Sequence, residues 1–117
     1  MAILRREHDD IVIMDVSGEF FGGPETHALD RAISNEIALG NLQLVVNLSG
    51  CRAMNSTAFA VLMGAHRVIR AIGGEIKLCG AQRRMQNLLQ VLHVNQLLEH
   101  HATEEEAVSA FEKRATA

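Results

Sequence analysis

The segment Asn55-Ser56-Thr57 holds the side chains in this 117-residue chain whose types and spacing could most readily do chemistry. Asn, Ser and Thr are good N-cap residues, and an apolar stretch follows them at once, so they are expected to begin a helix. A phosphate attached to a hydroxyl in the first turn would be stabilised by unpaired backbone N–H groups and by the positive end of the helix dipole. The segment therefore predicts a helix start that could also be a phosphorylation site.

The helix that should follow, about residues 57–72, carries two apolar stripes. One stripe consists of Leu62, Ala65, Ile69 and Ile72, and the other side holds Phe59, Met63, His66 and Arg70. If the first stripe packs on the sheet, Phe59 and Met63 are exposed beside the two hydroxyls. There they would offer another protein an apolar surface.

Other reactive side chains form no recognisable site. The six histidines are His8, His27, His66, His93, His100 and His101, and they form neither an HxxxH nor an HxH pattern. The two cysteines, Cys51 and Cys79, lack both CxxC and zinc spacing, so reduced thiols are expected. Gly18, Gly22 and Gly23 belong to no phosphate-binding motif and indicate a strand-to-helix turn. We therefore expect no metal, no cofactor and no catalytic centre.

Composition limits the partners. The formal charge is −3, from 14 acidic and 11 basic residues without a long basic run, which argues against nucleic acid. No apolar stretch approaches the length of a membrane span, and the first residues do not resemble a signal peptide. We expect a single domain, residues 1–117, in the cytoplasm. The sequence leaves both a monomer and a homodimer open.

The hydrophobic pattern predicts an α/β fold with the element order ββαβαβαα. Strands are expected at 3–8, 11–17, 42–48 and 75–79, and helices at about 24–39, 57–72, 84–92 and 104–114. Thr103 and Glu106 form a capping-box pattern before the last helix. Because helices connect the later strands, a mixed four-stranded sheet with about four helices follows.

This order of elements resembles the STAS domain family, the sulfate-transporter and anti-sigma-factor-antagonist domains. The family pattern is a strand and loop, then Asp-Ser-Ser/Thr-Gly opening a helix, then a Gly-Gly break and another strand. Here the corresponding segments are 44–50, Asn55-Ser56-Thr57-Ala58 and 73–78, and the resemblance spans nearly the whole chain. Asn55 replaces the usual Asp, Ala58 replaces the Gly, and His93 stands where a Gly commonly follows the late helix.

The resemblance implies a regulatory domain that binds an anti-sigma factor, itself a Ser/Thr kinase, and that is switched by phosphorylation. The phosphorylated position would be Thr57, with Ser56 as its neighbour. The partner-binding surface would consist of Asn55, Ser56, Thr57, Phe59, Met63, His66 and Arg67. One alternative is a non-phosphorylated STAS scaffold subunit of a stressosome-like or lipid-transport assembly. A small enzyme or ligand-binding domain is the interpretation that the sequence favours least.

Overall fold

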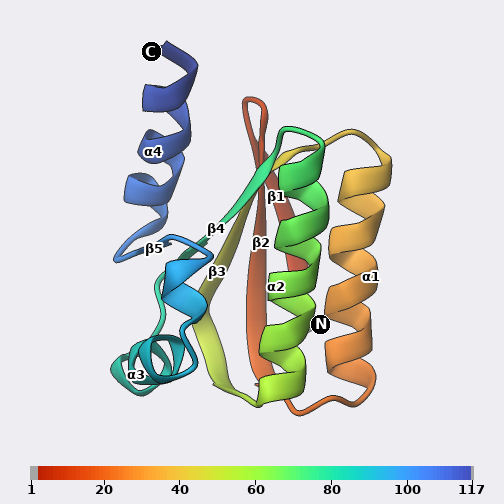
Figure 1. Cartoon of the computed structure of the whole chain (residues 1–117), viewed down its shortest axis with the longest axis vertical. Helices are drawn as coiled ribbons and strands as arrows, with labels where there is room; N and C mark the ends of the chain where they lie inside the picture. Colours follow the sequence, from red (N-terminus) through yellow and green to blue (C-terminus); the bar gives the residue numbers. More distant parts are fainter. Residues whose placement is uncertain (1–2, 117) are drawn as a thin grey trace.

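The protein folds as a mixed β-sheet with helices on both of its faces (Figure 1). The computed structural model describes residues 3–116, and side-chain burial as far as Glu112. The strands are β1 (Ile3–His8), β2 (Ile11–Phe20), β3 (Gln43–Met54), β4 (Glu75–Cys79) and β5 (His100–His101). The helices are α1 (Pro24–Ala38), α2 (Ser56–Ala71), α3 (Arg83–Val91) and α4 (Glu104–Thr116), with a short 3-10 turn, η1 (Val94–Gln96).

The α/β class, the helices and the mixed sheet agree with the sequence prediction, but the strand count does not. The sheet has the order β1-β2-β3-β4-β5, with β1 antiparallel to β2 and the remaining neighbours parallel. The fifth strand was not predicted because it has only two residues, His100 and His101, which pair with Leu78 and Cys79. Two histidines carry no strand signal of their own.

Strands β2 and β3 are also longer than predicted. The segments 18–20 and 49–54, expected as loops, continue the parallel ladder, with Gly18 opposite Cys51 and Phe20 opposite Met54. Register shifts near Ser17 and Gly18 let β2 pass through its small residues and resume pairing. The serine and glycine residues therefore give no strand pattern in the sequence, although the buried side chains of this segment still pack in the core.

The central strands are buried on both faces, as their nearly continuous apolar sequence predicts. Leu44 and Val46 of β3 join the core formed with α1, α2 and α3, whereas Val45 faces the opposite way. The second, smaller core consists of Ile11, Ile13, Val45, Cys79, Ala107, Val108 and Phe111. Helix α4 thus covers the face of the sheet opposite α1 and α2, as Figure 1 shows.

The connection from α2 to β4 requires a glycine at position 74. A Cβ there would lie 2.6 Å from Ile69 Cγ1 and would overlap the carbonyl oxygen of Leu42. The backbone N–H of Gly74 donates to the Ile69 carbonyl, which closes the end of the helix. This close approach fixes where α2 ends and where β4 enters beside β3.

Candidate functional site

The first turn of α2 follows directly from the end of β3. The backbone N–H of Asn55 donates to the Phe20 carbonyl at the end of β2 (3.0 Å), so the helix start is tied to the sheet. Asn55 is the N-cap, and its side-chain Oδ1 accepts a hydrogen bond from the Ala58 N–H (3.1 Å). A neutral amide therefore caps the start of the helix.

Ser56 and Thr57 are exposed on this first turn. Within the described residues, neither hydroxyl has a hydrogen-bond partner in the protein. As the first two residues of the helix, they carry backbone N–H groups that α-helical bonding leaves unpaired. An exposed hydroxyl above such N–H groups is accessible to another protein and can carry a phosphate.

The turn between β2 and α1 lies against Thr57. A Cβ on Gly22 would come within 3.4 Å of Thr57 Cγ2, and Gly22 has a φ of +90°, a conformation that favours glycine. The preceding residue, Phe21, is 57% exposed, whereas the other three phenylalanines are buried in the core. Sequence reasoning missed Phe21 and Gly22, although an apolar ring beside a run of glycines is the signal that could have indicated them.

Phe59 and His66 are not exposed, and the expectation that this side of α2 faces solvent is wrong. Phe59 is 1% exposed and His66 is 4% exposed, and Phe59 belongs to the main core. Met63 is half-buried against the same core, while Arg67 is exposed. The helix is rotated so that Phe59 packs inward beside Leu62, which leaves Asn55, Ser56, Thr57 and Arg67 as the accessible members of the predicted surface.

His66 instead joins α2 to the edge of β4. Its Nδ1 accepts a hydrogen bond from the Ile76 backbone N–H (3.3 Å). Burial, together with the nearby positive charges of Arg70 and Lys77, lowers the pKa of His66 below its ordinary value of 6.5. A neutral ring is the form that can accept the bond, so His66 is a structural residue of the sheet edge.

A shallow groove of about 570 Å³ runs between α1 and α2. Its walls are mainly apolar, and Thr57 contributes to its lining. The lining residues are Asp30, Ser34 and Ile37 of α1 and Thr57, Ala60, Val61, Gly64, Ala65 and Val68 of α2. The exposed hydroxyl therefore borders a concave apolar surface, which a partner protein can use.

The STAS domain family matches residues 2–107. The chain belongs to the STAS domain family. The match includes every strand and the whole of α2. No curated protein matches closely.

Solved structures with this fold include several anti-sigma factor antagonists. A putative anti-sigma factor antagonist from Thermotoga maritima superposes with a TM-score of 0.86 at 18% identity, covering 92% of each chain. The phosphorylated form of the Bacillus cell fate determinant SpoIIAA gives 0.72 at 21% identity, covering 94% of this chain and 99% of that one. An anti-sigma factor antagonist from Mycobacterium paratuberculosis gives 0.78 at 22% identity, covering 92% and 91%. At these identities the similarity shows the fold.

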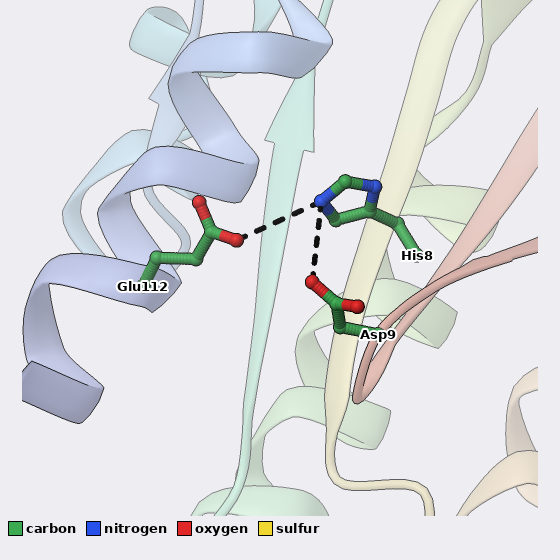
Figure 2. Close-up of side chains that lie close together, drawn as sticks. All are labelled: His8, Asp9 and Glu112. Atoms are coloured by element: carbon green, nitrogen blue, oxygen red, sulfur yellow. Dashed lines mark ion pairs between the residues drawn. The ribbon is translucent and has the colours of Figure 1, made fainter.

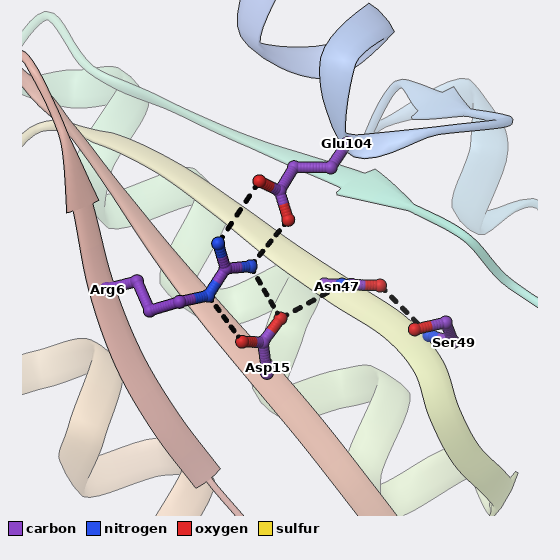
Figure 3. Close-up of polar contacts among 5 residues, drawn as sticks. All are labelled: Arg6, Asp15, Asn47, Ser49 and Glu104. Atoms are coloured by element: carbon purple, nitrogen blue, oxygen red, sulfur yellow. Dashed lines mark hydrogen bonds and ion pairs between the residues drawn. The ribbon is translucent and has the colours of Figure 1, made fainter.

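A polar network lies on the other face of this STAS domain, beside the start of α4 (Figure 3). Arg6 donates to both carboxylate oxygens of Asp15 and also pairs with Glu104. Asn47 donates to Asp15 and accepts from the Ser49 backbone N–H. The Arg6 guanidinium lowers the pKa of Asp15 below its ordinary value, and the network fastens the first turn of α4 to the sheet.

A second polar cluster joins the β1–β2 turn to α4 (Figure 2). His8 Nε2 lies 3.7 Å from an Asp9 oxygen and 3.6 Å from a Glu112 oxygen, and all three side chains are exposed. These are side-chain types that can bind a divalent cation. These contacts also join the β1–β2 turn to α4, so the cluster has a structural role within the fold.

The thiols of this STAS domain are buried and weakly acidic. Burial raises the pKa of Cys51 and of Cys79 to about 11. The thiolate, which is the nucleophilic form, is therefore scarce at neutral pH. In addition, none of the described helices is long and apolar enough to cross a lipid bilayer.

Proposed function

We propose that this STAS domain is a regulatory protein-binding domain of the anti-sigma factor antagonist type. It binds an anti-sigma factor that is also a Ser/Thr kinase, and phosphorylation of Thr57 releases it. The observation that carries the proposal is the pair of exposed hydroxyls, without partners in the described chain, on the first turn of α2. Because the kinase step consumes ATP, we place the proposed function in the cytoplasm.

The similarity to SpoIIAA supports this proposal. Solved structures of SpoIIAA represent an unphosphorylated anti-sigma factor antagonist and a phosphorylated form, and both share the fold of this chain. The fold therefore accommodates both states without a change of architecture. Thr57 occupies the second hydroxyl position of the family motif and is the favoured acceptor, with Ser56 as the alternative acceptor.

A phosphate on Thr57 would act through charge rather than refolding. It adds about −1.5 to −2 charges at an exposed point beside the α1–α2 groove. Within the free domain, the positive end of the α2 dipole and the unpaired N–H groups stabilise that charge. In a complex the same charge must be desolvated. Phosphorylation therefore destabilises the complex more than the free domain, and the partner dissociates.

Affinity capture with the full chain from the native cell, followed by phosphosite mapping, tests the proposal. We expect the wild-type chain to retain a protein kinase of the anti-sigma factor type, and incubation of the two with ATP to add one phosphate at Thr57. The Thr57→Ala variant should bind but remain unmodified. Retention of no kinase by the wild-type chain would contradict the proposal.

A second candidate function is that of a non-phosphorylated STAS scaffold subunit. The neutral Asn55 cap favours it, because the STAS pattern has a carboxylate at this position and a kinase could use that charge for recognition. This alternative predicts a stable partner in the capture experiment and an unchanged mass after incubation with kinase and ATP. An enzymatic function has the least support, since both thiols are buried and protonated.

A further inference from the structure

The β1–β2 turn and α4 bring together three side chains of types that bind metal ions (Figure 2). His8 ends β1, Asp9 follows it in the turn, and Glu112 belongs to α4. One ring nitrogen of His8 and one oxygen of each carboxylate all lie within 4.8 Å of one another. The three side chains are exposed, so an ion can reach them from the solvent.

The distances in this cluster fit ligands that share one ion. His8 Nε2 lies 3.7 Å from an Asp9 oxygen and 3.6 Å from a Glu112 oxygen, which is longer than the usual hydrogen-bond range of about 2.7–3.2 Å. By contrast, His101 Nε2 lies 3.1 Å from a Glu99 oxygen, which is a hydrogen-bond distance. Around tetrahedral zinc, with ligands at about 2.0–2.2 Å, neighbouring ligand atoms lie about 3.3–3.6 Å apart. Small side-chain movements would therefore bring the three atoms of the cluster onto one ion.

The ligand types discriminate among divalent ions. A neutral imidazole offers a nitrogen lone pair, which suits zinc and neighbouring transition metals, whereas magnesium and calcium prefer oxygen ligands. One imidazole and two carboxylates supply three protein ligands, and the exposure of the cluster leaves a further position for water. Zinc is therefore the ion that this set of side chains fits best.

We propose that His8, Asp9 and Glu112 bind a zinc ion, which fastens the β1–β2 turn to α4. Sequence patterns predict no metal site because the third ligand comes from the other end of the chain. Arg6 already joins β1 to the first turn of α4 through Glu104. Zinc would add a second attachment, further along the same helix. The proposal is independent of kinase binding, since none of the three ligands belongs to α2.

Calorimetric titration of the purified full chain with zinc tests the site. We expect one zinc ion to bind per chain, magnesium at the same concentration not to bind, and the thermal midpoint to rise with zinc concentration. His8→Ala and Glu112→Gln each remove one ligand, so each should bind zinc at least tenfold more weakly with an unchanged circular dichroism spectrum. Zinc should also slow amide hydrogen exchange around Glu112 in the wild-type chain and not in His8→Ala.

Matched controls make the same substitutions at exposed positions outside the cluster. His27→Ala on α1 and Glu105→Gln in the first turn of α4 should keep wild-type zinc affinity. Wild-type zinc affinity in either His8→Ala or Glu112→Gln would overturn the three-ligand site, because each ligand should be needed. Absence of zinc binding by the wild-type chain would overturn the proposal outright. Equal weakening by the two controls would place the zinc elsewhere and would also overturn it.

Discussion

Asn55 controls the start of α2 through one hydrogen bond, from the Ala58 N–H to its side-chain Oδ1. Replacing Asn55 with Ala leaves that N–H without its cap and should lower the free energy of unfolding by about 1 kcal/mol. Asn55→Asp retains an acceptor and adds a negative charge at the positive end of the helix dipole, so it should match or exceed wild-type stability. Urea unfolding of the three proteins measures the difference, and equal stability of Asn55→Ala and wild type would show that the cap contributes nothing.

His66 makes stability depend on pH near neutrality. Its folded-state pKa is lowered, mainly by burial, so the unfolded chain binds more protons as the pH falls through the ordinary value of 6.5. The contribution of His66 to the free energy of unfolding is therefore complete above about pH 7, and it is lost as the pH falls below the unfolded-state pKa of 6.5. His100, whose pKa burial also lowers, acts in the same direction.

We expect the free energy of unfolding to fall between pH 7.5 and 5.5, and to fall less steeply in a His66→Gln variant. The fold also lowers the pKa values of three carboxylates, Asp15, Glu36 and Glu99. Their contribution to stability is lost only below their ordinary pKa values, near pH 4. Urea titrations at several pH values separate the two ranges. A His27→Gln variant makes the same substitution at an exposed position and serves as the control. If His66→Gln keeps the wild-type slope, the assignment to His66 is refuted.

At the level of elements, we expect opposite effects on stability when two glycines near α2 are replaced with alanine. Gly64→Ala adds a methyl group that contacts nothing and removes the conformational cost of glycine, so the domain should gain about 0.5–1 kcal/mol. Gly74→Ala forces a methyl group into Ile69 and Leu42 and should cost about 1–3 kcal/mol. Thermal unfolding of both variants checks the pair, and a loss of stability in Gly64→Ala would mean that Gly64 has a role inside the fold.

The helices could be predicted from sequence to within a residue or two at most ends, because caps, prolines and glycines are local signals. The predicted strands 3–8 and 75–79 also match β1 and β4. The ends of β2 and β3 could not be predicted, since these strands continue through Ser17, Gly18 and Gly50, whose pairing depends on a neighbouring strand. The orientation of α2 could not be predicted from the sequence either. Its two apolar stripes are equivalent in sequence, and only packing on the sheet decides that Phe59 faces inward.

The candidate site was predictable in part. Ser56 and Thr57 are accessible, as their position at a helix start indicates, and Asn55 caps the helix. The contributions of Phe21 and Gly22 depend on a turn that meets Thr57 from 35 residues earlier in the chain. The ring beside the glycines is a local signal, but the contact of this turn with Thr57 is visible only in the structure.

The two faces of the sheet differ, because α1 and α2 cover one face, which carries the proposed docking surface, and α4 covers the other. Phe111 of α4 is buried in the smaller core, and the ring centroid lies 4.7 Å from the ammonium of Lys77, which is itself 1% exposed. Lys77 is neutralised by Glu75 and Glu99 at 2.9 and 2.8 Å. Docking of α4 therefore shields the Lys77 ammonium as well as apolar surface.

Phe111→Ala should cost about 3–5 kcal/mol, because it removes a buried ring and admits water beside Lys77. Since this core lies on the opposite face of the sheet from α2, the variant should bind the kinase with wild-type affinity wherever it remains folded. Urea unfolding and a binding titration measure the two effects. A loss of affinity larger than the loss of folded protein would mean that α4 belongs to the docking surface.

Release by phosphorylation is tested by comparing kinase binding of the purified full chain before and after stoichiometric phosphorylation at Thr57. We expect the phosphorylated chain to keep its fold, judged by circular dichroism, and to bind at least tenfold more weakly. Equal affinity of the two forms would contradict release by phosphorylation, because an outward oxygen on the docking face could not then be what controls release.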